Sequence, residues 1–156
     1  MNDYIIKANN YYLKQLRQCV GVQYFEADGA YWLTNGYVVH RIPENFMELN
    51  PLIIKEANED LKNTILSILE DNNSRQYAKE TGVVKKQGIL TMTAFILESS
   101  QLAIWFNKKL VDLFPPYSKI YATEPLQPAI VKRSDEIIGI ILPVKAVTEE
   151  DIRLFI

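Results

Sequence analysis

The sequence contains very little of the two residue types that most often carry nucleophilic or cofactor chemistry. Its 156 residues include one cysteine, Cys19, and one histidine, His40. A lone cysteine excludes an intrachain disulfide and is typical of proteins in reducing compartments. Cys19 could serve as a nucleophile only with a base beside it, and His40 falls in an expected strand with no obvious partner. We therefore expect Cys19 to be a buried structural residue.

Excess charge and long apolar runs are also missing. The net charge is −2, so no overall positive field favours nucleic acid or a membrane surface, although a local basic face is compatible with this total. No apolar run approaches the roughly 20 residues that span a bilayer. The first residues lack the basic and apolar regions of a signal peptide. We expect a cytoplasmic protein without membrane contact.

Recognisable catalytic patterns are absent as well. The sequence has no metal-spaced set of His and Cys, no Gly-rich phosphate loop and no frame for a Ser/His/Asp triad. The carboxylates of Asp112, Glu124, Asp135 and Glu136 are scattered and are typical of turns and helix surfaces, although a nuclease built on carboxylates alone stays open as an alternative. We predict a protein that is not an enzyme and that holds no metal or cofactor.

What is present suits one globular domain over residues 1–156, because 48% of the residues are hydrophobic and 23% are charged. A short strand is expected at residues 4–8. A helix should follow, capped by Asn9-Asn10, with Leu13, Leu16 and Val20 on one face and an end at Gly21. Asp28-Gly29 and Asn35-Gly36 are hairpin turns that separate expected strands at 22–27, 31–34 and 37–42.

The second half repeats this order after an insertion at residues 44–89. The insertion is expected to hold an amphipathic helix at 51–72, opened by Pro51, and a polar surface loop at 73–88. Then come a strand at 90–98, a helix capped by Ser99-Ser100 and ended by Pro115-Pro116, and strands at 119–124, 128–132 and 137–142. Halves 4–43 and 90–145 thus predict an α+β fold of two β-α-β-β-β units, with antiparallel sheets and two helices on one face.

This arrangement resembles one domain of the bacterial DNA sliding clamp, the processivity ring of the replicative polymerase. Residues 32–39, Trp-Leu-Thr-Asn-Gly-Tyr-Val-Val, resemble the clamp segment Ala-Thr-Asp-Gly-His-Arg-Leu at Thr34 and Gly36 but not at Tyr37 and Val38. The closing segment of clamps is matched at Leu126, Pro128, Gly139, Pro143, Val144 and Lys145. A complete clamp subunit has three such domains, so a small relative encoded by a phage or mobile element fits better than a housekeeping clamp.

The resemblance implies two kinds of site. Clamps hold duplex DNA through basic residues on helices, here Lys14, Arg17, Lys108 and Lys109, whose alternative role is a solvated surface. Clamps also bind short Gln-x-x-Leu-Phe-like peptides in a pocket, which would be lined here by Thr34, Gly36, Tyr37, Val38, Leu142, Pro143 and Val144. In one isolated domain these two segments should lie too far apart, so a head-to-tail homo-oligomer is expected to bring them together. The alternative is a plain hairpin turn and a strand end.

The tail at residues 147–156 allows two interpretations. Residues 151–155, Asp-Ile-Arg-Leu-Phe, resemble a clamp-binding peptide that would dock on a neighbouring copy or on the host clamp. The alternative is a short helix opened by Thr148 that packs onto the body of the chain. For the whole chain we predict an accessory protein of DNA replication. The alternative is a protein–protein interaction module with a clamp-like fold and no DNA binding.

Overall fold

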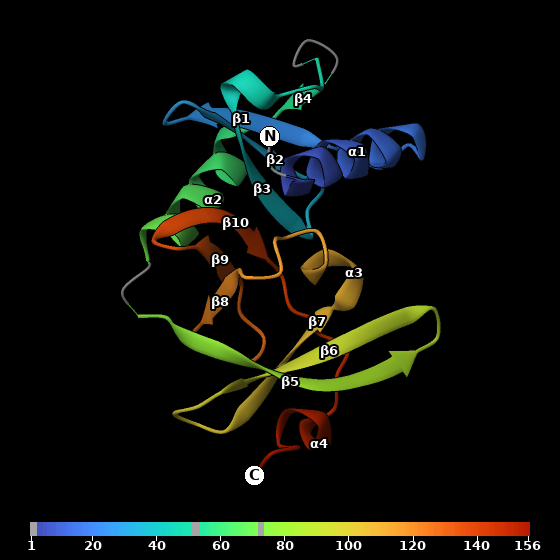
Figure 1. Ribbon diagram of the computed structural model, residues 1–156, viewed down its shortest axis with the longest axis vertical. Coiled ribbons are helices and arrows are strands. Elements are labelled where there is room, and N and C mark those ends of the chain that lie inside the picture. The colour runs from blue at the N-terminus through green and yellow to red at the C-terminus, as the bar shows by residue number, and fades with distance from the viewer. Residues whose placement is uncertain (1–2, 51–53, 72–73) are drawn as a thin grey trace.

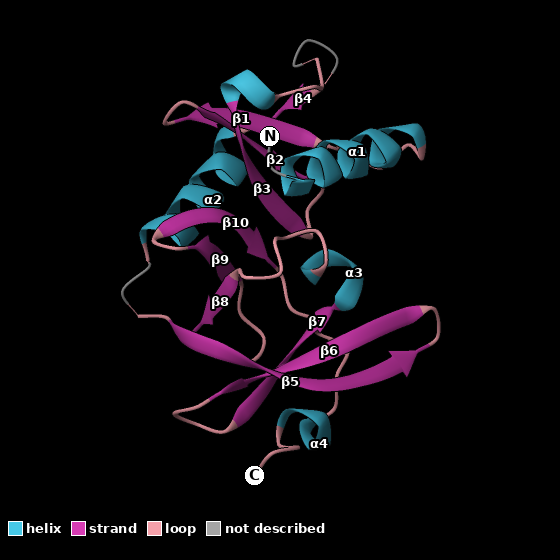
Figure 2. Ribbon diagram, viewed as in Figure 1, coloured by secondary structure: helices cyan, strands magenta, loops and turns pink. Residues whose placement is uncertain are grey.

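The computed structural model describes residues 3–50, 54–71 and 74–156. These residues form an α+β fold built on one open ten-stranded sheet with few helices (Figures 1 and 2). The strands are β1 (Gln23–Ala27), β2 (Ala30–Thr34), β3 (Val38–Pro43), β4 (Lys55–Glu56), β5 (Gln76–Gln87), β6 (Leu90–Leu97), β7 (Leu102–Asn107), β8 (Lys119–Ala122), β9 (Ala129–Arg133) and β10 (Glu136–Ile141). Their order across the sheet is β4-β1-β2-β3-β10-β9-β8-β5-β6-β7, and only β4 and β1 pair in parallel. The α+β class is confirmed, but the expected antiparallel sheets are joined into one.

The first helix, α1 (Asp3–Arg17), begins where we expected a strand. The strand predicted at residues 4–8 is wrong because Ile5, Ala8 and Tyr12 continue one helical face, and burial of that face against the sheet outweighs the strand preference of Ile5 and Ile6. The helix ends at Arg17, before the predicted end at Gly21. Cys19 adopts a positive φ of 60° beyond the helix and is exposed, so the expectation of a buried cysteine is also wrong.

The meander of three strands after α1 is confirmed. β1 pairs antiparallel with β2 through the turn at Asp28-Gly29, and β2 pairs with β3 through the turn at residues 35–37. Asp28 and Gly29 both have positive φ, at 54° and 73°, which is the conformation that a tight hairpin of this kind requires. The two Gly-containing turns thus predicted the ends of β1, β2 and β3 correctly.

The insertion differs from its predicted form. Of the helix expected at 51–72, residues 51–53 and 72 lie outside the described residues, and Lys55–Glu56 form strand β4 instead. Helix α2 (Glu59–Glu70) begins after Asn58, whose side chain accepts a hydrogen bond from the Leu61 amide. The loop expected at 73–88 is wrong: β5 is a long strand there, paired with β6 along much of its length and with β8 only at Gln76–Ala78 (Figure 2). Its polar composition reflects its exposure rather than a loop.

The helix expected after Ser99-Ser100 is largely wrong. Residues 102–107 are strand β7, antiparallel to β6, and only α3 (Lys108–Val111), one turn long, is helical before Pro115. The run from Ala103 to Phe106 is buried on both faces, and a short continuous apolar run of this length is typical of a buried strand. Because apolar residues occupy both faces of this strand, Ala103 and Phe106 fall at the spacing of a helical face.

The predicted repeat is present in altered form. The second half has the order β6-β7-α3-β8-β9-β10, whereas the first half lacks an opening strand and has the order α1-β1-β2-β3. β3 and β10 are antiparallel neighbours at the centre, with His40 opposite Gly139, so the two meanders extend outward in opposite directions from this central strand pair. What recurs is therefore a helix followed by three antiparallel strands, and not the complete β-α-β-β-β unit.

The helices are divided between the two faces of the sheet. α1, α3 and Phe114 cover one face and share its large core, so the two helices of the repeat lie on the same side (Figure 1). On the opposite face, α2 covers a cluster around Trp32 and Ile140. Farther along that face, the C-terminal helix α4 (Glu149–Ile152) and the residues around it cover a cluster centred on Trp105.

A polar group is enclosed at the centre of the large core. The Tyr12 hydroxyl lies 2.7 Å from His40 Nδ1 and 3.0 Å from the Leu33 carbonyl oxygen. All donors are satisfied if His40 Nδ1–H donates to the Tyr12 oxygen and the Tyr12 hydroxyl donates to Leu33. Nε2 is then an unprotonated acceptor, without a partner among the described residues. Burial lowers the pKa of His40 to about 3 because the imidazolium would lose its hydration.

Phe114 closes this centre from the helix side. Its ring stacks on the His40 ring, with centroids 4.5 Å apart and planes 12° apart. A Cβ atom at Gly139 would lie 2.4 Å from the Val39 carbonyl oxygen and 2.5 Å from Phe114 Cε1. Only glycine therefore fits at the point where the two meanders meet.

Candidate functional site

The two segments predicted to line a peptide pocket meet within one chain. The Leu142 amide donates a hydrogen bond of 3.1 Å to the Tyr37 carbonyl oxygen. The cause is the central strand pair: because β3 and β10 are antiparallel, the beginning of β3 lies beside the end of β10, with Val38 opposite Ile141. The expectation that these segments lie too far apart in a single domain is therefore wrong.

Two hollows flank this junction and together are lined by all seven predicted pocket residues. The larger, which we call the Tyr37 groove, has a volume of about 550 Å³ and lies between α1, α3 and the segment at 142–146. The smaller, of about 200 Å³, lies on the α2 side and is lined by Ile65 and Ile68. Tyr37 and Leu142 line both hollows, so Tyr37, which is 66% exposed, stands between them.

The turn before β3 is fixed firmly to α1. Asn35 Oδ1 accepts hydrogen bonds from the amides of Tyr37 and Val38, at 3.0 and 3.3 Å. Asn35 Nδ2 donates to the Tyr11 hydroxyl at 2.7 Å and to Gln15 Oε1 at 3.0 Å. An aspartate at this position could accept the first pair of bonds but could not donate the second. Asn35 was not among the predicted site residues, yet it holds the groove in shape.

The seven predicted residues divide into structural and accessible groups. The Thr34 hydroxyl accepts a hydrogen bond from the Gly36 amide, and both Thr34 and Val38 are buried. These two residues behave as the hairpin alternative expected. Tyr37 and Gly36 are exposed, Leu142 and Val144 are half-buried along the groove, and Pro143 between them is buried. Leu110 adds an apolar wall, and Gln15, Asn107 and Lys145 form a polar rim. An apolar floor with a polar rim suits a short apolar peptide segment.

The four predicted DNA-binding residues lie on the face covered by α1 and α3 (Figure 1). Lys14 and Arg17 are exposed in the last turn of α1, and Lys109 is exposed on α3. None of these three has an ion-pair partner among the described residues. Lys108 Nζ, in contrast, lies 2.8 Å from Asp112 Oδ2, and this contact raises the pKa of Lys108.

The tail is a short helix packed on its own chain. The Thr148 side chain and the Asp151 side chain form a reciprocal capping box at the start of α4. Asp151 Oδ1 lies 2.8 Å from Lys85 Nζ, which lowers the pKa of Asp151, and its carbonyl oxygen accepts a bond from Trp105 Nε1 at 3.1 Å. Phe155 packs against the Trp105 cluster. Asp151 and Phe155, which suggested a docking peptide, thus contact this chain's own sheet, as the short-helix alternative predicts.

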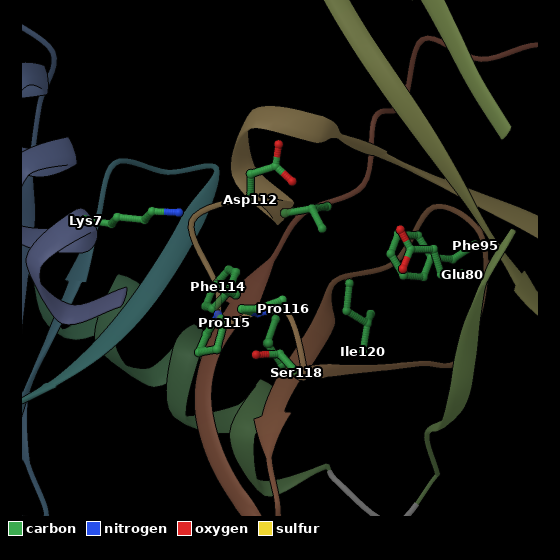
Figure 3. Close-up of a pocket in the computed structure, with 11 residues that line it drawn as sticks. Lys7, Glu80, Phe95, Asp112, Phe114, Pro115, Pro116, Ser118 and Ile120 are labelled. Carbon is green, nitrogen blue, oxygen red and sulfur yellow. The ribbon is translucent and has the colours of Figure 1, made fainter. Parts of the chain in front are cut away.

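A third hollow, of about 430 Å³, lies below the other end of α3 and is shown in Figure 3. Lys7 reaches toward it from α1, Glu80 lines its other side from β5, and Phe114 and Pro116 stand between them. Asp112, at its edge, is already paired with Lys108. Because its charged groups come from separate walls, they do not converge on one point where a bond could be polarised.

No three His, Cys, Asp or Glu side chains among residues 3–50, 54–71 and 74–156 are grouped closely enough to hold a metal ion. No helix in these ranges is long and apolar enough to span a bilayer. Comparison of the chain with protein-family models, curated proteins and solved structures finds no match.

Proposed function

We propose that this chain is a non-enzymatic module that binds short apolar peptides in the Tyr37 groove, with an architecture related to one domain of a sliding clamp. The observation that carries the proposal is the meeting of residues 34–38 and 142–144 around one groove. The recurrence of a helix and three strands on either side of the central β3–β10 pair supports the clamp-like part. On the clamp resemblance, the expected partners are replication proteins or a host clamp.

A peptide-binding measurement tests this function. A fluorescent peptide of the Gln-x-x-Leu-Phe type should bind the full chain, detected by fluorescence anisotropy. Tyr37→Ala should weaken binding by about 30-fold, the effect of removing a contact of about 2 kcal/mol at the centre of an interface. Tyr117→Ala is the matched control because Tyr117 is equally exposed, at 65%, and lies outside both hollows. Failure of the unchanged protein to bind, or equal binding by Tyr37→Ala, would refute the proposal.

A second function, sequence-independent contact with duplex DNA, is favoured by the exposed pair Lys14 and Arg17 at the end of α1. Two phosphate contacts should give a slope near −1.8 in a plot of log K against log salt concentration, about −0.9 for each contact. The double substitution Lys14→Gln, Arg17→Gln should remove this dependence. Absence of duplex binding at low ionic strength, with peptide binding retained, would favour the interaction module without DNA.

The sequence led us to expect head-to-tail assembly in order to complete the peptide pocket, but the proposed groove does not need it. One chain already brings both groove segments together, so peptide binding does not require a second copy. Assembly would be needed only for enclosing a duplex, which one domain cannot do. A solution mass measured with and without duplex DNA tests whether copies associate.

A further inference from the structure

One strip of the sheet, beside the regions that α2 and α4 cover, carries lysines and tyrosines. The strip, which we call the Tyr-Lys patch, consists of Tyr77 and Lys79 on β5, Lys119 and Tyr121 on β8, and Lys132 on β9. Tyr77 is the cross-strand partner of Tyr121, and Lys119 is the partner of Lys132. Partners in a ladder point to the same face, as do residues two apart along a strand, so all five side chains share one face.

This face is the one that α2 and α4 cover elsewhere. Tyr121 is the partner of Ile130, which belongs to the cluster under α2, and Lys79 is the partner of Ile96, which is in turn opposite Ala103 of the Trp105 cluster. The patch therefore lies between two covered regions. Lys79 and Lys119 are exposed, Tyr77 is 42% exposed, and Tyr121 and Lys132 are half-buried, so the patch remains accessible.

The charge of the patch is opposite in sign to that of the chain. It contributes three positive charges, whereas the whole sequence carries a net charge of −2. The ion pairs found among the described residues use Arg41, Arg75, Lys85 and Lys108, so no carboxylate neutralises a patch lysine there. Lysines whose charge is not neutralised by a neighbour are available to a polyanion.

Each tyrosine ring has an ammonium group beside it. Lys119 Nζ lies 5.5 Å from the centroid of Tyr77, and Lys132 Nζ lies 5.0 Å from that of Tyr121. The two ring centroids are 5.9 Å apart. An exposed contact between ammonium and ring is weaker than the stacking of a base on an aromatic side chain. A base can therefore displace the ammonium group from the ring, and the lysine then stays close enough to reach a phosphate.

From these contacts we propose that the Tyr-Lys patch binds single-stranded DNA. Flat aromatic surfaces interleaved with lysines are the combination that binds single strands without sequence preference, because the rings stack on bases and the ammonium groups contact phosphates. A duplex is a poor ligand for such rings because its base faces are already stacked. The stacking and phosphate contacts of the patch need no ribose 2′-hydroxyl, so a DNA single strand satisfies them fully.

The patch is independent of the Tyr37 groove. The groove is built with α1 and α3 on one face, whereas the patch lies on the face that α2 and α4 cover. The two sites share no residue, so each proposal can fail while the other stands.

The test is a titration of the full chain with fluorescein-labelled oligo-dT of about 15 nucleotides, near the upper site size of a single-strand-binding domain. Three phosphate contacts should give a slope near −2 in log K against log salt, about −0.7 for each contact. Lys119→Gln should reduce the magnitude of that slope by about 0.7. Tyr77→Leu should weaken binding by about tenfold and leave the slope unchanged, because it removes stacking and no charge.

The controls separate the patch from general effects of charge and folding. Lys55→Gln makes the same change of charge on exposed strand β4, and Tyr117→Leu makes the same change of side chain at an exposed loop position; neither should alter binding. Thermal unfolding of each variant should match the unchanged protein within a few degrees. The proposal is overturned if duplex DNA binds as tightly as oligo-dT, if Lys14→Gln, Arg17→Gln abolishes oligo-dT binding, or if oligo-dT does not bind.

Discussion

The enclosed histidine makes stability depend on pH in a way that can be calculated. His40 is the only histidine in the chain, and it is fully buried with a pKa of about 3 in place of the usual 6.5. In the unfolded chain the ring takes up a proton as the pH falls below 6.5, whereas in the folded chain it does not until about 3. The neutral ring thus contributes stability that is fully present above pH 6.5 and is lost as the pH falls toward 3.

The size of the effect follows from the difference in pKa. Each pH unit within this window costs about 1.36 kcal/mol, so acidification from pH 7.5 to pH 5.0 should lower the free energy of unfolding by about 2 kcal/mol through His40 alone. Tyr12, the titratable group that faces the ring, stays neutral throughout because burial raises its pKa well above the ordinary value. Solvent does not screen the buried His40 ring, so the value of about 2 kcal/mol needs no reduction.

The assay is urea unfolding at both pH values for the unchanged protein and for His40→Asn. Asparagine can place an amide donor near the Nδ1 position but does not titrate, and the carboxylates that titrate over this range are common to both proteins. We expect the unchanged protein to lose about 2 kcal/mol more than the variant between pH 7.5 and pH 5.0. Equal losses, or an NMR titration of His40 with a midpoint near 6.5 in the folded protein, would show that the ring is not enclosed as described.

Three further outcomes are expected. Gly139→Ala should destabilise the fold by about 3 kcal/mol or prevent folding, because the added methyl group meets the Val39 carbonyl and Phe114, and urea unfolding measures this loss. A stability loss below about 0.5 kcal/mol would contradict that close approach. Cys19 should react with a thiol reagent in the folded protein nearly as fast as in urea, because it is exposed; strong protection would contradict this placement. Phe155→Ala should loosen α4 from the Trp105 cluster and shift tryptophan emission to longer wavelength, and an unchanged spectrum would count against that packing.

Local turn signals predicted structure well because they depend on a few neighbouring residues. Asp28-Gly29 and Asn35-Gly36 set the strands of the first meander, and the strands at the end of the chain were also expected close to their observed positions. The antiparallel pairing of neighbouring strands followed from these turns. A tight turn depends on the residues within it, so distant contacts did not change these predictions.

The spacing of apolar residues predicted the wrong element where a strand is buried on both faces or is largely exposed. Residues 102–107 are apolar on both faces of β7 and therefore imitate a helical pattern, whereas β5 is polar enough to imitate a loop because much of it is exposed. In α1, Ile5 and Ile6 suggested a strand, although Ala8 and Tyr12 extend the same helical face. Each error arises because the pairing partners of a strand, which decide its environment, are distant in sequence.

The two sequence segments that line the groove were weak signals until the strand order showed that they are neighbours. The signal at Thr34-Asn35-Gly36 was equally consistent with a plain turn, and the signal at Pro143 with the end of a strand. Neither indicated the other, because about a hundred residues separate them. The antiparallel pairing of β3 with β10 places the two ends together, and Gly139 permits that pairing because no side chain intervenes between Val39 and Phe114. The groove is therefore anchored beside the close contact of Gly139 with Val39 and Phe114, so its apolar walls are preorganised for the proposed peptide binding.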